Sequence, residues 1–109
     1  YDGSIDPTFT ATTLGVNAIV VQPDGKIIIG GLFNSVNGVV NFTRIARLTT
    51  TGTLDAAFTS TGTGSCTCAV EALTLQTDGK ILVGGSFNQF NGATGINNIV
   101  RLNPADGST

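Results

Sequence analysis

The chain contains one segment twice, and this internal repeat limits what it can fold into more than any other feature. Gln22 to Gly31 (QPDGKIIIGG) returns as Gln76 to Gly85 (QTDGKILVGG), 54 positions further on. The same spacing relates pairs on either side of this segment, among them Val16 and Val70, Phe33 and Phe87, and Arg47 and Arg101. A repeat of this length is one supersecondary unit that cannot bury its apolar face alone, so neighbouring units have to stack. We therefore divide the chain into two tandem repeats of one continuous unit, residues 1–53 and 54–109.

A second motif repeats at a shorter spacing. Gly3-Ser4-Ile5-Asp6, with Phe9, returns as Gly52-Thr53-Leu54-Asp55, with Phe58, 49 positions on. The difference between the two spacings indicates an insertion in the second copy, around residues 60–69. Asp106-Gly107-Ser108 begins the same motif again. Two chains placed end to end would therefore continue the pattern almost in register. Tyr1 is not an initiator and there is no signal-peptide pattern, so we expect a processed form or a fragment.

Each repeat has the pattern of β-strands joined by tight turns. Apolar and β-branched runs predict four strands in the first repeat, at Val16 to Gln22, Lys26 to Phe33, Phe42 to Leu48, and Leu54 to Phe58. The continuous run Ile27-Ile28-Ile29 predicts burial on both faces, and Gly30-Gly31 predicts a bulge or a close backbone approach. No window has helical periodicity. The predicted fold is all-β, with two tandem four-stranded antiparallel repeats that resemble propeller blades and are completed by neighbouring subunits.

Turn residues recur at equivalent positions of the two repeats. Asp can cap a turn and Gly adopts positive φ, while Asn-Gly is typical of tight hairpins. The predicted structural turn residues are Asp24, Gly25, Asp78, Gly79, Asn37, Gly38, Asn91 and Gly92. Each aspartate could also ligate a cation such as Ca²⁺, but each stands alone, without the dense carboxylate spacing of a calcium loop. We favour turn capping and predict no metal site.

The composition excludes several classes of function. The chain has no His, Trp or Met, so the commonest general base and metal ligand is missing. Charged residues make up 11% and the net charge is -2, which leaves no basic patch for nucleic acid. No apolar run approaches the length of about 18 residues that a membrane helix requires. We expect no catalytic residue, no cofactor and no enzyme activity.

Four of the five basic residues occupy equivalent positions in the two repeats, which indicates an architectural role. They are Lys26 with Lys80, and Arg47 with Arg101. We expect each to pair with an acid of the repeat or to lay its stem on apolar surface. The predicted structural ion pairs involve Arg47, Arg101, Asp6 and Asp55.

The two cysteines, Cys66 and Cys68, lie in the insertion of the second repeat. They are too isolated for a zinc site, which needs four ligands, and they lack the Cys-x-x-Cys spacing of redox motifs. Three states stay open from sequence. They could bond to each other in a tight loop, bond to another subunit, or stay reduced.

The composite motif resembles the delta-sixty repeat over nearly the whole chain. The matching features are Asp-Gly-Lys-Ile followed by two glycines and a phenylalanine, then Asn-Gly, Arg-Leu, and Asp-Gly-Ser-(Ile/Leu)-Asp-x-x-Phe. This resemblance implies propeller-like β domains of large bacterial proteins that are secreted or held at the cell surface. It implies no catalytic residue. Only two copies are present, which favours assembly from several chains.

Two functions are compatible with these features. The first is a structural subunit of an extracellular, self-assembling filament, whose termini join head to tail by β-strand complementation. The predicted junction is residues 1–9 and 103–109, with interface residues Gly3, Ile5, Phe9, Leu102 and Gly107. A closed ring of subunits is a variant of this idea. The alternative is a cell-surface binding or adhesion module whose blades present loops to a surface glycan or protein.

Overall fold

The computed structural model describes residues 3–9, 11, 13, 15–40, 44–64 and 68–109, and these residues form only β-strands, turns and loops. The strands are β1 (Val16–Val21), β2 (Ile27–Gly31), β3 (Ser35–Val36), β4 (Val39–Val40), β5 (Ile45–Leu48), β6 (Val70–Leu75), β7 (Ile81–Gly85), β8 (Gln89–Phe90), β9 (Ala93–Thr94) and β10 (Ile99–Leu102). None of the described residues forms a helix, so none forms one able to cross a membrane.

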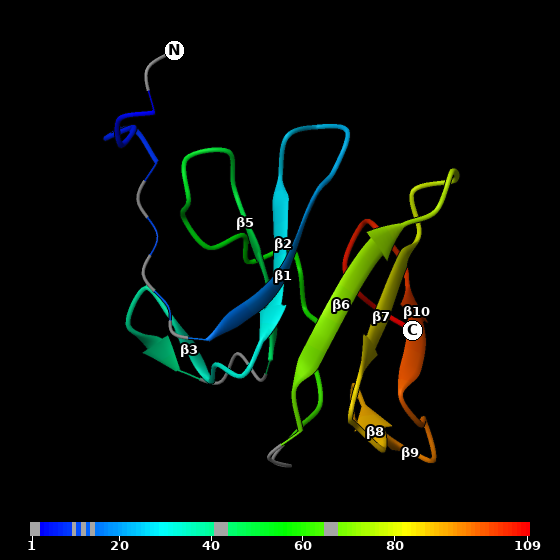
Figure 1. The fold of residues 1–109 in the computed structure, drawn as a ribbon. Helices are drawn as coiled ribbons and strands as arrows, with labels where there is room; N and C mark the ends of the chain where they lie inside the picture. Colours follow the sequence, from blue (N-terminus) through cyan, green and yellow to red (C-terminus); the bar gives the residue numbers. More distant parts are fainter. Residues whose placement is uncertain (1–2, 10, 12, 14, 41–43, 65–67) are drawn as a thin grey trace.

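The strands form two three-stranded antiparallel sheets, one from each repeat, which stand side by side as two blades (Figure 1). Blade 1 has the order β1-β2-β5, and blade 2 has the equivalent order β6-β7-β10. A small hairpin, β3–β4 or β8–β9, comes between the second and third strand of each blade. The predicted all-β fold with antiparallel, propeller-blade-like repeats is confirmed.

The blades differ from the sequence expectation in having three strands each, and in blade 1 the predicted fourth strand is reduced to a single bridge between Leu48 and Leu54. Asp55 ends this pairing because it begins a turn, in which its Oδ1 accepts a hydrogen bond from the Ala57 N–H at 3.0 Å. Phe42, the first residue of the predicted third strand, lies outside the described residues.

Strand register gives each blade two faces, because residues directly opposite each other point to the same side. The front face is defined in blade 1 by Ala18, Val20, Ile28, Gly30, Ile45 and Arg47, and in blade 2 by Ala72, Thr74, Leu82, Gly84, Ile99 and Arg101. The back face is defined in blade 1 by Val16, Ile19, Val21, Ile27, Ile29, Ala46 and Leu48, and in blade 2 by Val70, Leu73, Leu75, Ile81, Val83, Val100 and Leu102. Ile28 and Ile29 are both buried, which confirms burial on the two faces of β2.

A bulge distorts the first strand of each blade. The register shifts between Val16 and Ala18, opposite the glycine pair of β2, and the equivalent shift occurs in β6. A Cβ atom on Gly31 would collide with the carbonyl oxygen of Gly15. The sequence prediction of a bulge and a close backbone approach at Gly30-Gly31 is confirmed.

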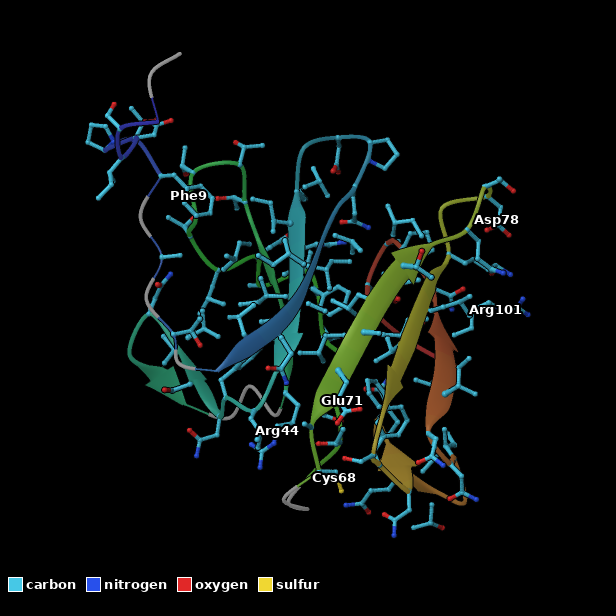
Figure 2. The ribbon with its side chains drawn as sticks, viewed as in Figure 1. Phe9, Arg44, Cys68, Glu71, Asp78 and Arg101 are labelled. Atoms are coloured by element: carbon cyan, nitrogen blue, oxygen red, sulfur yellow. The ribbon has the colours of Figure 1, made fainter. Side chains whose placement is uncertain are left out.

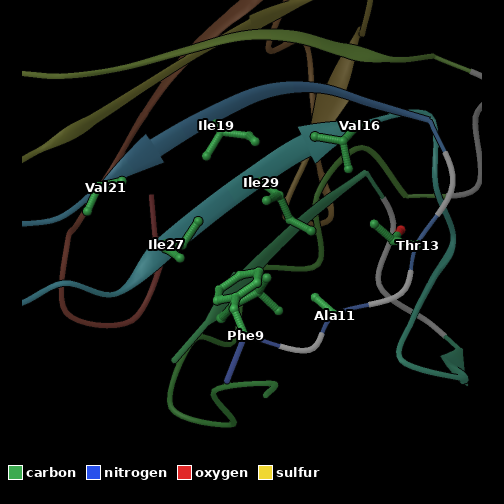
Figure 3. A pocket seen from close by; sticks show the side chains of 9 residues that line it. Phe9, Ala11, Thr13, Val16, Ile19, Val21, Ile27 and Ile29 are labelled. Carbon is green, nitrogen blue, oxygen red and sulfur yellow. The ribbon is translucent and has the colours of Figure 1, made fainter. Parts of the chain in front are cut away.

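Phe9 and Arg101 lie on opposite sides of the blade pair (Figure 2). Phe9 lies beyond blade 1, whereas Arg101 lies on the far side of blade 2 (Figure 2). Phe9, Ala11 and Thr13 line one side of a cavity whose other side is the back face of blade 1 (Figure 3). The leading segment therefore lies along the blade face that does not meet blade 2 and leaves Ile19 and Val21 of β1 exposed.

Candidate functional site: the faces of the blades

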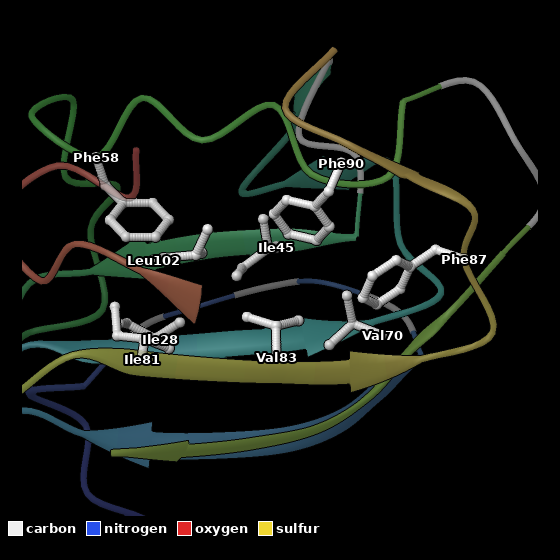
Figure 4. Packing of buried hydrophobic residues seen from close by; sticks show 9 residues of the cluster. All are labelled: Ile28, Ile45, Phe58, Val70, Ile81, Val83, Phe87, Phe90 and Leu102. Carbon is white, nitrogen blue, oxygen red and sulfur yellow. The ribbon is translucent and has the colours of Figure 1, made fainter. Parts of the chain in front are cut away.

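The front face of blade 1 packs against the back face of blade 2. Their side chains form a common cluster of Ile28, Ile45, Phe58, Val70, Ile81, Val83, Phe87, Phe90 and Leu102 (Figure 4). Ile28 and Ile45 are completely buried there. The contact is so close that a Cβ atom on Gly30 would collide with the Val70 side chain. Apolar burial between blades thus stabilises the pair, since neither blade has a second layer of its own.

A buried cation from blade 1 reaches blade 2 beside this apolar cluster. The Arg47 side chain is only 4% exposed. Its Nη1 donates to the carbonyl oxygen of Pro104 at 2.7 Å and to Gln22 Oε1 at 3.3 Å, and its Nη2 donates to the carbonyl oxygen of Ala105 at 2.8 Å. Gln22 Nε2 also donates to the Pro104 oxygen, at 3.2 Å. The two side chains together bind the turn that follows β10.

Asp55 neutralises this cation at the point where the chain leaves blade 1. Its Oδ2 lies 2.9 Å from Arg47 Nε and 2.9 Å from Lys26 Nζ. The hydrogen bond from Lys26 and the charge of Arg47 keep the pKa of the Asp55 carboxyl below its usual value, against the opposing effect of burial. The guanidinium carbon of Arg47 also lies 5.0 Å from the centre of the Phe58 ring, within the range of a cation–π contact.

The front face of blade 2 carries equivalent residues but is open. Ile99 is 63% exposed, although its counterpart Ile45 is 0% exposed. Arg101 is exposed, and neither it nor Lys80 forms an ion pair with any described residue. Gln76 Oε1 is buried and has no hydrogen-bond partner among the described residues, whereas the counterpart atom of Gln22 accepts from Arg47. A buried polar atom without a partner is costly, so this face is incomplete in the single chain.

The back face of blade 1 is open along β1, where Ile19 and Val21 are exposed, whereas Ile29 and Leu48 on its other strands are buried. It borders an apolar cavity of about 250 Å³ whose lining includes Phe9, Val16, Ile19 and Leu48 (Figure 3). Ile19 is 61% exposed. The back face of blade 2 is instead covered, because Ile28 and Ile45 of blade 1 pack on it (Figure 4).

The leading Asp-x-x-Phe motif has the same local geometry as its second copy. Asp6 Oδ1 accepts from the Thr8 N–H at 2.9 Å, and the Phe9 N–H donates to the Asp6 carbonyl oxygen at 3.3 Å. The hydrogen bonds from the Thr8 hydroxyl and N–H keep the pKa of the Asp6 carboxyl below its usual value. Asp6 forms no ion pair with any described residue. Of the predicted interface residues, Gly3 and Ile5 are exposed and Phe9 is 38% exposed.

The structure corrects the predicted role of the trailing residues as a free junction. Leu102 belongs to the buried cluster between the blades, and Gly107 is buried against Phe58. Asn91 Nδ2 donates to the Gly107 carbonyl oxygen at 3.0 Å, and the Thr59 N–H donates to the Asp106 oxygen at 2.8 Å. The trailing segment therefore packs within its own chain, against the Asp55–Phe58 turn and the residues that follow it.

The predicted turn residues all lie in turns. Asp24 and Asp78 each accept a backbone hydrogen bond at 3.0 Å from the lysine two positions on. Positive φ angles occur at both residues of each Asn-Gly pair and at the glycines that follow the two aspartates. Each Asn-Gly pair closes the two-residue connection of a small hairpin, β3–β4 or β8–β9.

The described residues contain no group of three or more His, Cys, Asp or Glu that could hold a metal ion. Cys66 lies outside the described residues, so the proposed pairing with Cys68 stays a prediction.

Sequence reasoning missed the open blade faces as a possible site. Gln76, Leu82 and Gly84 belong to the repeated segment, but nothing in their residue types or in that of Ile99 indicates a site. They stand out only when the burial of each is compared with that of its equivalent in blade 1, and the sequence does not show which of the two a neighbouring blade covers. The signal available in the sequence was the equivalence itself.

A family model described as "Domain of unknown function (DUF5122) beta-propeller" matches residues 22–58 and 76–109, which is well over half of the chain. The two matched segments begin at equivalent positions, Gln22 and Gln76, so each repeat contains one copy of the family unit. The first segment includes Arg47, Asp55 and Phe58. Comparisons with curated proteins and with solved structures found no match.

Proposed function

This chain belongs to the DUF5122 β-propeller family, and we propose that it is a structural subunit that assembles head to tail with further copies of itself. The front face of blade 2 stacks on the back face of blade 1 of the next copy. A contact between two different surfaces of one molecule propagates from copy to copy until the array closes or grows as a polymer.

The difference in burial between equivalent residues carries this proposal. Ile45 and Arg47 on the front face of blade 1 are buried against blade 2, whereas Ile99 and Arg101 on the front face of blade 2 are exposed. The residue types are the same, so the two environments differ in the blade that packs on the first of these faces. The front face of blade 2 exposes apolar side chains, and the back face of blade 1 borders an apolar cavity. Contact between these two faces of neighbouring copies would bury both apolar surfaces.

Strand complementation contributes less to this junction than the terminal motifs predict. Leu54 adds one bridge to the outer strand of blade 1. In blade 2, the hydrogen bond from the Asn103 N–H to the Ser108 oxygen repeats the one between Thr49 and Thr53. This single bond closes the turn after β10, and no isolated bridge like that of Leu54 is formed there by the described residues. Face-to-face packing is the main contact in the proposed assembly.

Membership of a propeller family favours closure of the array. Propellers close with about four to eight blades, so about two to four chains of two blades would complete a ring. An array that does not close would be the filament that the sequence suggests. The finer likeness to the delta-sixty repeat supports an extracellular location, and the proposed role requires no catalytic step.

The assembly is tested with a substitution on the open front face. A Cβ atom on Gly84 has no neighbour closer than 3.8 Å in the single chain, whereas one on the equivalent Gly30 would collide with Val70 of the next blade. Gly84→Val should therefore leave the fold intact and block docking of the next copy. Ala93→Val, on the exposed hairpin strand β9, is the matched control.

Light scattering and negative-stain microscopy give the readout, with circular dichroism and thermal unfolding as the check on folding. The wild type and Ala93→Val should form rings or filaments, and Gly84→Val should remain a folded monomer. A wild type that stays monomeric at every soluble concentration would overturn the proposal. Unchanged assembly of a folded Gly84→Val variant would show that the front face is not the contact.

A further inference from the structure

Blade 1 holds the Asp-x-x-Phe turn of the second repeat in a site made by three side chains. Lys26 and Arg47 both contact Asp55 Oδ2 at 2.9 Å, and Gln22 orients Arg47 through its Oε1. Phe58, three residues after Asp55, lies under the guanidinium and is only 5% exposed. The site thus recognises a carboxylate and an aromatic ring that one turn holds at a fixed separation.

Blade 2 carries the same three side chains, without a turn bound to them. Gln76, Lys80 and Arg101 are the repeat equivalents of the residues that hold Asp55. Within the described part of the chain, Lys80 and Arg101 form no ion pair and Gln76 Oε1 has no partner. Apolar surface for a ring lies beside them, because Ile99 and Arg101 line the same shallow hollow on the front face.

The chain also carries a second ligand of the required shape. Asp6 and Phe9 have the spacing of Asp55 and Phe58, and each turn forms equivalent internal hydrogen bonds. Phe9 lies against the back face of blade 1 near Leu48, as Phe58 clusters with the equivalent Leu102 of blade 2. Phe9 is nevertheless 38% exposed, against 5% for Phe58, which packs in the cluster between the blades and lies under the Arg47 guanidinium.

We infer that Gln76, Lys80 and Arg101 form a binding site for the Asp6–Phe9 turn of a second copy of this chain. Lys80 and Arg101 bind the Asp6 carboxylate, and the guanidinium of Arg101 covers the Phe9 ring. This inference rests on the proposed head-to-tail assembly and specifies its polar contact. The ligand and site lie at opposite sides of one blade pair, so a chain cannot satisfy its own site (Figure 2).

The charges at the two surfaces are complementary in this arrangement. The site contributes two cations and its ligand one carboxylate, the combination that surrounds Asp55 inside the chain. Close charge pairs at protein interfaces couple strongly enough that reversal of one partner weakens binding at least about tenfold. Contact through Arg101 would also give the Gln76 oxygen the donor that it lacks.

A charge swap tests this contact. Asp6→Arg and Arg101→Asp, each alone, should weaken assembly at least about tenfold, measured as the concentration at which light scattering detects half-assembly. The double variant Asp6→Arg with Arg101→Asp should recover assembly, because it restores an opposite pair across the junction. Ala93→Arg adds a cation on the hairpin strand β9, away from both faces, and should assemble as the wild type does.

The outcomes separate this inference from the proposed function. If Asp6→Arg and Arg101→Asp each assemble as well as the wild type, the inference is overturned. Face-to-face stacking would then still stand. Loss of assembly in both singles without recovery in the double variant, all folded by circular dichroism, would also count against a direct Asp6–Arg101 contact. A wild type that never assembles would overturn the stacking itself.

Discussion

At the scale of single residues, Arg47 and Asp55 link the two repeats. Arg47 is buried with hydrogen bonds to three carbonyl or amide oxygens, and Asp55 balances its charge. Such a pair stabilises only because its remaining donors are satisfied, since removal of one partner leaves a buried charge. The sequence indicated both residues through their repeat equivalence, but it could not tell that Arg101 and Asp6, of the same types, would form no ion pair with any described residue.

Asp55→Asn should lower the free energy of unfolding by about 2 kcal/mol at neutral pH, because the ion pairs of Arg47 and Lys26 are lost. The folded-state pKa of Asp55 is depressed. Its stabilisation is therefore complete above the unfolded-state pKa of about 3.9 and disappears as the pH falls through the lower folded value.

Urea unfolding of the monomeric form between neutral and strongly acidic pH measures this difference. The gap between wild type and Asp55→Asn should close only in acid, and Asp6→Asn, which removes an exposed carboxylate, should show almost no gap at neutral pH. A gap that is independent of pH would mean that Asp55 acts by its shape and not by its charge.

At the scale of elements, each blade is organised around a glycine pair that faces a bulge. The sequence predicted the strands, the Asn-Gly hairpins and the close approach at Gly30-Gly31, because these depend on local backbone preferences. It did not predict the loss of the fourth strand. A turn that starts at Asp55 competes with pairing there, and the outcome depends on contacts of Asp55 with residues far along the chain.

Gly31→Ala should destabilise the protein by about 3 kcal/mol, since the new Cβ would occupy the space of the Gly15 carbonyl oxygen. Gly84→Ala is the matched control, because its Cβ would meet nothing closer than 3.8 Å. Thermal or denaturant unfolding followed by circular dichroism compares the two variants. Equal stability of both would mean that the bulge can relax to admit a side chain.

At the scale of the whole molecule, the blades form an unclosed stack with two different free faces. One interface is complete within the chain, and it serves as a structural template for contacts with a next copy. The covered and the open front face have nearly the same residue types, so composition alone could not distinguish them. The two faces should contribute differently to the free energy of unfolding, because the stabilisation from apolar side chains is proportional to the surface that they remove from water.

Ile45→Ala and Ile99→Ala compare the same residue type at the same repeat position on the two front faces. Ile45 is fully buried, so its truncation should cost about 2–5 kcal/mol of unfolding free energy in the monomer. Ile99 is 63% exposed, so its truncation should change the monomer by no more than about 0.5 kcal/mol. Similar losses at both positions would show that blade 2 is already covered in solution.

The sequence alone determined the repeat, the all-β class, the turns and the glycine positions, because these follow from local preferences and from a period that is visible by inspection. The tertiary structure alone decided which copy of each equivalent residue is buried, which arginine has its carboxylate and which Asp-x-x-Phe turn is bound. The physical reason is that burial and pairing depend on the neighbouring blade, so two equivalent residues of the same type can differ in what lies beside them. Arg47 and Arg101 illustrate this difference, since one is enclosed between blades and the other faces solvent.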